Sequence, residues 1–208
     1  MTGEDAYRWL MNAASSSAYN LFDMHVVASI FAISIQEMEA DHRPLGDGTG
    51  LGPAEIAAIV GDMFPARASD IAAMTQGLSP VIDEEEQSVR DILLMYADGD
   101  PRLAVPMAAM VARRCKSPHH LWQDLGLRNR GELSQLMNRN FGALARRNTN
   151  DMKWKRFLYR MVCGAEGFTL CTAPVCTDCD DFEHCFGAED GEARIARMRN
   201  DRTAAAAE

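Results

Sequence analysis

The sequence predicts an all-α protein: a multi-helix, bundle-like domain followed by an irregular cysteine-rich loop and a mobile tail. Three observations lead to this prediction. Apolar residues recur at helical spacing along most of the chain, no stretch shows sustained period-two alternation, and four of the six cysteines fall within fifteen residues near the end. We therefore divide the chain into a helical domain (1–164), a cysteine-rich metallocluster-binding segment (165–188) and a tail (189–208).

The first 40 residues are expected to be helical, with a break at the three serines 15–17. From Asn20 the chain is apolar almost all round, which is typical of a buried helix. His25 lies inside this run and is interpreted as a satisfied core residue without a functional role. The most apolar run, Val26 to Ile35, has ten residues. Since a bilayer span needs roughly 20 apolar residues, no transmembrane helix is expected.

Residues 41–53 carry glycines at every second position but fit neither the dinucleotide-binding pattern nor the P-loop pattern, so a flexible connection is expected there. Proline, capping residues and apolar spacing then predict the later helices. They are expected to start at Pro53, at Asp83 (capped toward Glu86), at Pro106, at Pro118 after a Ser117 cap, at Asn129 (running to Leu144), and at Thr149 or Asn150, the last closing at Cys163 with Gly164 as a left-handed C-cap.

The net charge of −9 is unevenly distributed. Residues 111–160 contain 12 Lys or Arg and 3 Asp or Glu, whereas both flanks are acidic. Such a band attracts an anion or an acidic partner, or it is a solvated face paired with the acidic N-terminal half. Its last helix places four basic residues on one face, and these are candidates for anion or partner binding: Lys153, Lys155, Arg156 and Arg160.

The acidic N-terminus lacks the basic region of a secretion signal, which favours a cytoplasmic protein. Thiols stay reduced in that compartment, so clustered cysteines indicate metal ligands before disulfides. The cluster has the spacing C-x4-C-x2-C-x5-C and consists of Cys171, Cys176, Cys179 and Cys185. Structural zinc sites usually show two C-x2-C knuckles, whereas plant-type ferredoxins begin C-x4-C-x2-C. The spacing favours an iron–sulfur cluster and leaves zinc as the alternative.

Further ligands are possible near this cluster. Cys163 lies eight residues before Cys171, and His184 directly precedes Cys185. The adjacent histidines 119 and 120 are candidates as well, but at most one of them can face a site comfortably if both lie on a helix. Cys115 is expected to be structural, although its basic neighbours would lower its pKa if it were exposed.

Three motifs together resemble the NifQ family of nitrogen-fixation proteins. They are the four-cysteine motif ending in Cys185-Phe-Gly187, the run Pro118-His-His-Leu-Trp-Gln-Asp-Leu-Gly-Leu127, and the run Met152-Lys-Trp-Lys-Arg-Phe-Leu-Tyr-Arg160. The resemblance is clear over residues 106–188. The family often has an asparagine where this chain has His119, so His120 is the better-matched histidine.

This resemblance implies a carrier, not an enzyme. It would bind a molybdenum–iron–sulfur cluster on Cys171, Cys176, Cys179 and Cys185. It would then donate molybdenum for assembly of the nitrogenase iron–molybdenum cofactor. The implied partners are the cofactor-assembly scaffold complex, the nitrogenase iron protein and a molybdate source.

The alternative from another class is a zinc- or iron–sulfur-stapled interaction or regulatory module. No nucleophile–base constellation indicates hydrolase or transferase chemistry, and no membrane partner is expected. Overall acidity argues against nucleic-acid binding, which needs a basic surface with stacking aromatic residues.

Overall fold

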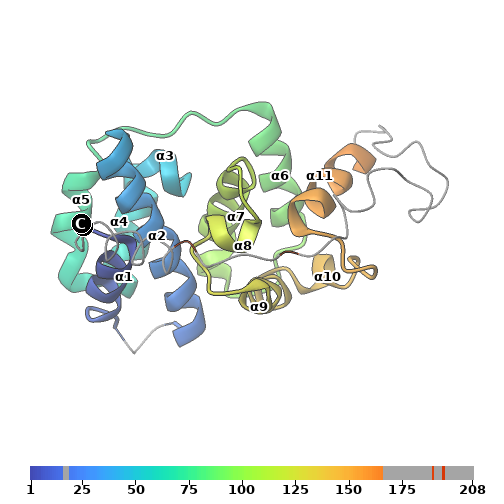
Figure 1. Ribbon diagram of the computed structural model, residues 1–208, viewed down its shortest axis with the longest axis horizontal. Helices are drawn as coiled ribbons and strands as arrows, with labels where there is room; N and C mark the ends of the chain where they lie inside the picture. Colours follow the sequence, from blue (N-terminus) through green and yellow to red (C-terminus); the bar gives the residue numbers. More distant parts are fainter. Residues whose placement is uncertain (16–18, 166–188, 190–193, 195–208) are drawn as a thin grey trace, which may run out of the picture.

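The computed structural model describes residues 1–15, 19–165, 189 and 194, and this part of the chain is helical (Figure 1). Eleven α-helices and one 3-10 turn follow one another within these residues. Their bounds are α1 Gly3–Met11, α2 Leu21–Asp41, α3 Leu45–Thr49, α4 Pro53–Met63, η1 Pro65–Arg67, α5 Ala68–Met74, α6 Glu84–Met95, α7 Pro101–Cys115, α8 Leu121–Asp124, α9 Arg130–Asn140, α10 Gly142–Ala145 and α11 Trp154–Ala165. The prediction of a multi-helix protein is confirmed for this part of the chain. The cysteine-rich loop lies outside it.

Helix α2 forms the centre of the core. Every residue from Val26 to Ile35 is buried. The two serines in this run are accommodated because each hydroxyl donates to a carbonyl one turn back, Ser29 to His25 and Ser34 to Ile30. By length and composition α2 could cross a membrane, but 67% of its most apolar window is buried against other helices, as expected for a core helix.

The helices gather in two groups, one at each end of the molecule (Figure 1). Helices α1 to α5 gather at the N-terminal end, where α1 and α3 pack on α2 and α4 packs on α5. Helices α6 to α11 form the other end, in which α6 contacts both α7 and α11. Because α3 also contacts α7, the two ends meet beside α2.

The glycine-rich stretch is packed, so the expected flexible connection is wrong. It contains the short helix α3, and Gly46, Gly50 and Leu51 are buried around it. A Cβ on Gly48 would lie 2.8 Å from the Ser34 Cβ on α2. Gly50 adopts φ +73° and closely approaches Arg113 on α7. These glycines therefore let α3 approach two neighbouring helices.

Several predicted helix starts are confirmed because their caps are local. The Asp83 side chain accepts from the Glu86 N–H, and the Asn129 side chain accepts from the Glu132 N–H. Pro53 occupies the first turn of α4, as expected.

Other boundaries differ from the predictions. Helix α7 begins at Pro101 under an Asp100 cap, so Pro106 lies inside it and does not start it. Helix α8 begins at Leu121 and not at Pro118. The preceding N–H groups of His119 and His120 instead donate to the side chains of Asp124 and Gln123.

The predicted long helix from Asn129 is split at Phe141, whose buried ring and φ of −141° end α9. Asp98 then caps α10, because its carboxylate accepts from the N–H groups of Gly142 and Ala143. Helix α11 starts at Trp154, after a turn with Asp151 at φ +52° and two Asn148 bonds to Met152. The helix continues to Ala165, so Gly164 is not its C-cap.

Candidate functional site

The four motif cysteines and His184 lie outside the described residues. The structure describes the chain on both sides of that segment. Before it, α11 ends at Ala165. After it, the Glu189 carboxylate lies 3.0 Å from Arg130 Nε and 3.4 Å from His120 Nδ1, and its side chain is only 3% exposed. The chain therefore leaves from the end of α11 and returns to the start of α8 and α9.

Asp124 connects two of the sequence motifs. Its side chain is fully buried, and Lys155 of α11 donates to Asp124 Oδ2 at 2.6 Å. The Lys155 ammonium also donates to the Ser117 carbonyl. The motif 118–127 and the motif 152–160 thus meet in one buried ion pair.

The same carboxylate contacts two further residues, His119 and Arg194. The backbone N–H of His119 donates to Asp124 at 3.1 Å, and the imidazole of His119 lies 3.1 Å from the other oxygen. Arg194, which follows the cysteine segment, donates to Asp124 at 3.2 Å. Asp124 therefore joins α8, α11 and the C-terminal region of the chain.

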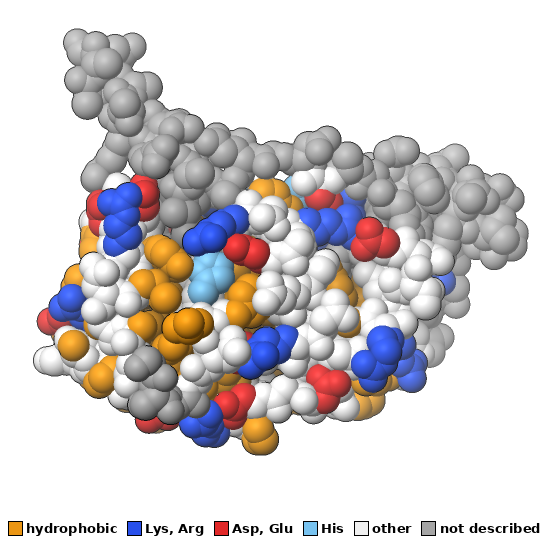
Figure 2. Space-filling model, turned by 90° about the horizontal axis from the view of Figure 1, so that it is seen from below, with side chains coloured by type: hydrophobic (Ala, Val, Ile, Leu, Met, Phe, Trp, Pro, Cys, Tyr) orange, Lys and Arg blue, Asp and Glu red, His pale blue; other side chains and the backbone are white. Residues whose placement is uncertain are grey.

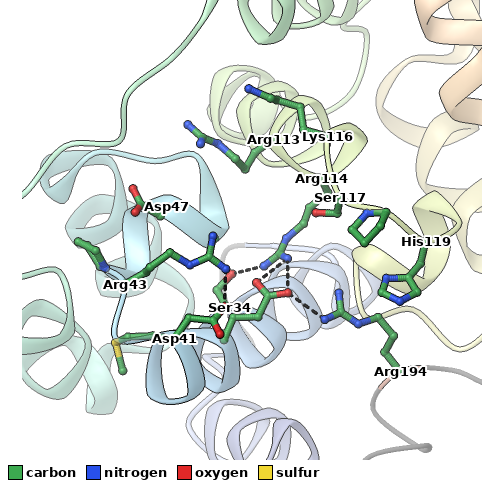
Figure 3. A pocket seen from close by; sticks show the side chains of 15 residues that line it. Ser34, Asp41, Arg43, Asp47, Arg113, Arg114, Lys116, Ser117, His119 and Arg194 are labelled. Atoms are coloured by element: carbon green, nitrogen blue, oxygen red, sulfur yellow. Dashed lines mark hydrogen bonds and ion pairs between the residues drawn. The ribbon is translucent and has the colours of Figure 1, made fainter.

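A second carboxylate extends this network onto α2. Glu37 accepts two bonds from Arg114 Nη1, at 2.9 and 2.8 Å, and one from Arg194 at 2.9 Å. Arg114 is only 2% exposed, and it also donates to the Ser34 hydroxyl at 2.6 Å (Figure 3). We call Glu37, Arg114, Asp124, Lys155 and Arg194 the charge network. Paired, hydrogen-bonded groups of this kind are how a core tolerates charge.

The candidate anion- or partner-binding residues have different surroundings. Arg156 and Arg160 are exposed, Lys153 is half-buried, and Lys155 points to Asp124 instead of sharing their solvent-facing side. The role of the four in binding stays a prediction. Among the described side chains of the face in Figure 2, basic groups alternate with acidic ones, so that face has no continuous basic surface.

The possible additional ligands also have defined places. His120 is the N-cap residue of α8 and Cys163 is a half-buried free cysteine in α11. Cys115 is buried, and burial raises the pKa of its thiol to about 12, in agreement with its expected structural role. Within residues 1–15, 19–165, 189 and 194, no group of three His, Cys, Asp or Glu side chains could hold a metal ion.

Both ring nitrogens of His25 have polar partners, as predicted. Its Nδ1 lies 2.9 Å from the Tyr7 hydroxyl and its Nε2 lies 3.2 Å from the Glu132 carboxylate. By contrast, sequence reasoning did not single out Glu37, Arg114, Asp124 and Arg194. A usable signal existed for Asp124 alone, since a lone carboxylate within Leu-Trp-Gln-Asp-Leu-Gly-Leu must find partners if that run is buried.

The structure describes two residues of the tail, Glu189 and Arg194. Most of residues 189–208 lie outside the described part of the chain, so the predicted mobility of the tail stays a prediction. Arg194 and Glu189 themselves pair with buried or half-buried groups of α2, α8 and α9.

Comparison with known proteins identifies relatives. The family model described as NifQ matches residues 26–187, which include all four motif cysteines. The chain is 37% identical over 172 residues to the protein NifQ homolog of Sinorhizobium fredii (strain NBRC 101917 / NGR234), covering 83% of this chain and 75% of that protein. It is 32% identical over 160 residues to protein NifQ of Rhodobacter capsulatus, covering 77% and 87%.

Protein NifQ of Azotobacter vinelandii is 37% identical over 122 residues, covering 59% of this chain and 63% of that protein. No solved structure matches the chain. The match to the family model spans most of the sequence, and the relatives from Sinorhizobium fredii and Rhodobacter capsulatus align over more than three quarters of it. The chain therefore belongs to the NifQ family.

Proposed function

We propose that this protein is a metallocluster carrier in nitrogen fixation. It binds a molybdenum–iron–sulfur cluster as cargo and donates molybdenum for assembly of the nitrogenase iron–molybdenum cofactor. The observation that carries the proposal is that the family match runs through Cys171, Cys176, Cys179 and Cys185. Its acceptors are the cofactor-assembly scaffold complex and the nitrogenase iron protein, and it works in the cytoplasm without catalysing a reaction of its own.

The chemistry of the donor set supports this proposal. Thiolates are soft ligands that bind iron–sulfur clusters, and a C-x4-C-x2-C run also begins the plant-type ferredoxin motif. Cys163, His120 and His184 are the candidates for further ligands. Cys163 lies in α11, which precedes the cysteine segment in the chain, and His120 caps α8 and contacts Glu189, which follows that segment.

The surroundings of the segment support a carrier in a second way. Glu189 is held by Arg130 and His120, and Arg194 is held by Glu37 and Asp124. On the other side the segment is joined to α11, which packs on α6. A segment anchored at both ends loses less entropy when its thiolates gather around a ligand. Lys153, just before α11, and Arg156 and Arg160 on α11 are the basic groups proposed to face an anionic cluster or an acidic partner.

The test is metal analysis of the full chain after anaerobic purification. We expect iron, sulfide and molybdenum in the protein and a broad visible absorption band. Replacing Cys176 and Cys179 by Ser should remove the metal and the absorption. The matched control is Cys115→Ser, which removes a thiol outside the motif. Colourless protein with one zinc per chain would instead favour the stapled interaction module.

The additional ligands are tested separately. If Cys163 or His184 is a ligand, Cys163→Ser or His184→Gln should change the visible spectrum while leaving part of the iron bound. If the spectrum and metal content match those of the unmodified chain, the residue is not a ligand.

A further inference from the structure

A polar pocket of about 420 Å³ lies between α2, α3 and the C-terminal end of α7 (Figure 3). This volume is in the lower part of the range for small-molecule sites, roughly 300 to 1,000 Å³. Five Lys or Arg side chains and three Asp or Glu side chains line it. The basic residues are Arg43, Arg113, Arg114, Lys116 and Arg194.

Positive charge exceeds negative charge in the lining of the pocket. Two of the lining cations, Arg114 and Arg194, pair with the same carboxylate, Glu37. Arg194 also pairs with Asp124, which is not a lining residue and which Lys155 pairs with as well. Arg114 Nε is buried and has no hydrogen-bond partner among the described residues. Burial also lowers the pKa of Arg114, because the nearby Glu37 offsets its desolvation only in part. An anion in the pocket would supply the missing negative charge.

The rim of the pocket carries cations that can turn toward a ligand. Arg43 pairs with Asp41 at 2.5 Å, but these side chains are 57% and 50% exposed. Lys116 pairs with Asp83, with exposures of 32% and 52%. Exposed pairs of this kind contribute little stability, so a ligand can replace the carboxylate at small cost.

We propose that this pocket binds a tetrahedral oxyanion of the sulfate and molybdate class. Guanidinium groups donate paired, charge-assisted hydrogen bonds that match oxyanion geometry. Among the described lining residues there is no Phe, Tyr or Trp on which a nucleobase could stack. A small inorganic anion therefore fits the lining better than a nucleotide does.

The position of the site links it to the cysteine segment. Arg194 borders the pocket and follows Cys185 by nine residues. His119, another lining residue, precedes His120, which contacts Glu189. An oxyanion bound here lies where the chain returns from the cysteines. Assigning that oxyanion as molybdate rests on the proposed function, whereas oxyanion binding itself does not.

The test measures binding of sulfate and of molybdate by titration calorimetry in a buffer of low chloride concentration. Sulfate is titrated into the unmodified chain, since it does not ligate thiolates. Molybdate is titrated into the variant with all four motif cysteines replaced by Ser, which separates the pocket from the cluster ligands. Circular dichroism checks that this variant keeps its helices. We expect one anion per chain in both titrations.

The decisive variant is Arg43→Gln with Lys116→Gln, which removes both rim cations and leaves the charge network intact. We expect its dissociation constant for either anion to rise roughly tenfold or more. The control is Arg8→Gln with Arg128→Gln, which makes the same charge change at side chains that are 63% and 69% exposed and outside the pocket. The control should bind within about twofold of the parent.

If both double variants lose the same anion affinity, the effect is one of long-range charge and the proposed site is refuted. The absence of saturable binding would also refute it. Binding of sulfate without binding of molybdate would support the oxyanion site and contradict its assignment to molybdate. Metal content after anaerobic purification is scored independently. A chain that carries molybdenum but binds no sulfate would refute the pocket and leave the carrier function standing.

Discussion

Replacing Asp124 by Asn removes the charge that holds α8, α11 and Arg194 together. The carboxylate is fully buried and accepts from Lys155 at 2.6 Å and from Arg194 at 3.2 Å. Removing one member of a buried ion pair typically costs about 3–5 kcal/mol, because the remaining charges stay buried without a counter-charge. The side chains of Lys155 and Arg194 are 18% and 15% exposed and recover some hydration. We therefore expect the lower end, about 3 kcal/mol.

The assay is urea unfolding of the metal-free chain followed by circular dichroism. With a urea dependence of about 2–3 kcal/mol per M, the midpoint of Asp124→Asn should fall by about 1–1.5 M. The control is Asp41→Asn, which makes the same chemical change in the half-exposed pair with Arg43 and should cost less than about 1 kcal/mol. If the two variants lose the same stability, the reasoning about the buried network is refuted.

Three further outcomes follow from the contacts. Gly48→Ala should cost about 1–3 kcal/mol in thermal unfolding, because its Cβ would lie 2.8 Å from the Ser34 Cβ; an unchanged melting temperature would show that α3 can shift freely. Burial raises the pKa of the Cys115 thiol from 9.0 to about 12, so this thiol should resist alkylation in the folded chain at pH 8, as mapped by mass spectrometry; rapid labelling would contradict this. For the same reason the stability of the fold should fall as the pH rises from about 9 toward 12. Lys116 lowers the pKa of Asp83 below 3.8, so the pair stabilises the fold above that pH, and this stabilisation is lost in acid. In urea unfolding at several pH values, Lys116→Gln should lose less stability in acid than the parent chain does, and identical pH profiles for the two chains would speak against the pair.

The family motifs were visible in the sequence, but their spatial relation was not. Asp124 and Lys155 are 31 residues apart, and Arg114 and Glu37 are 77 apart. Whether such charges meet depends on how α2, α7, α8 and α11 pack. The pocket follows from the same packing, because its cations come from α7, from the loop before α3 and from the chain after the cysteine segment.

The sequence by itself determined the helical class, the starts at Asp83 and Asn129, the buried character of α2 and the family. These depend on contacts within three or four residues or on the identity of the residues alone. Only the tertiary structure decided that the glycine-rich stretch packs as α3, since Gly48 and Gly50 are constrained by neighbours on α2 and α7. It also decided that buried charges from four helices and Arg194 form one network, because long-range ion pairs are set by helix packing and not by local spacing.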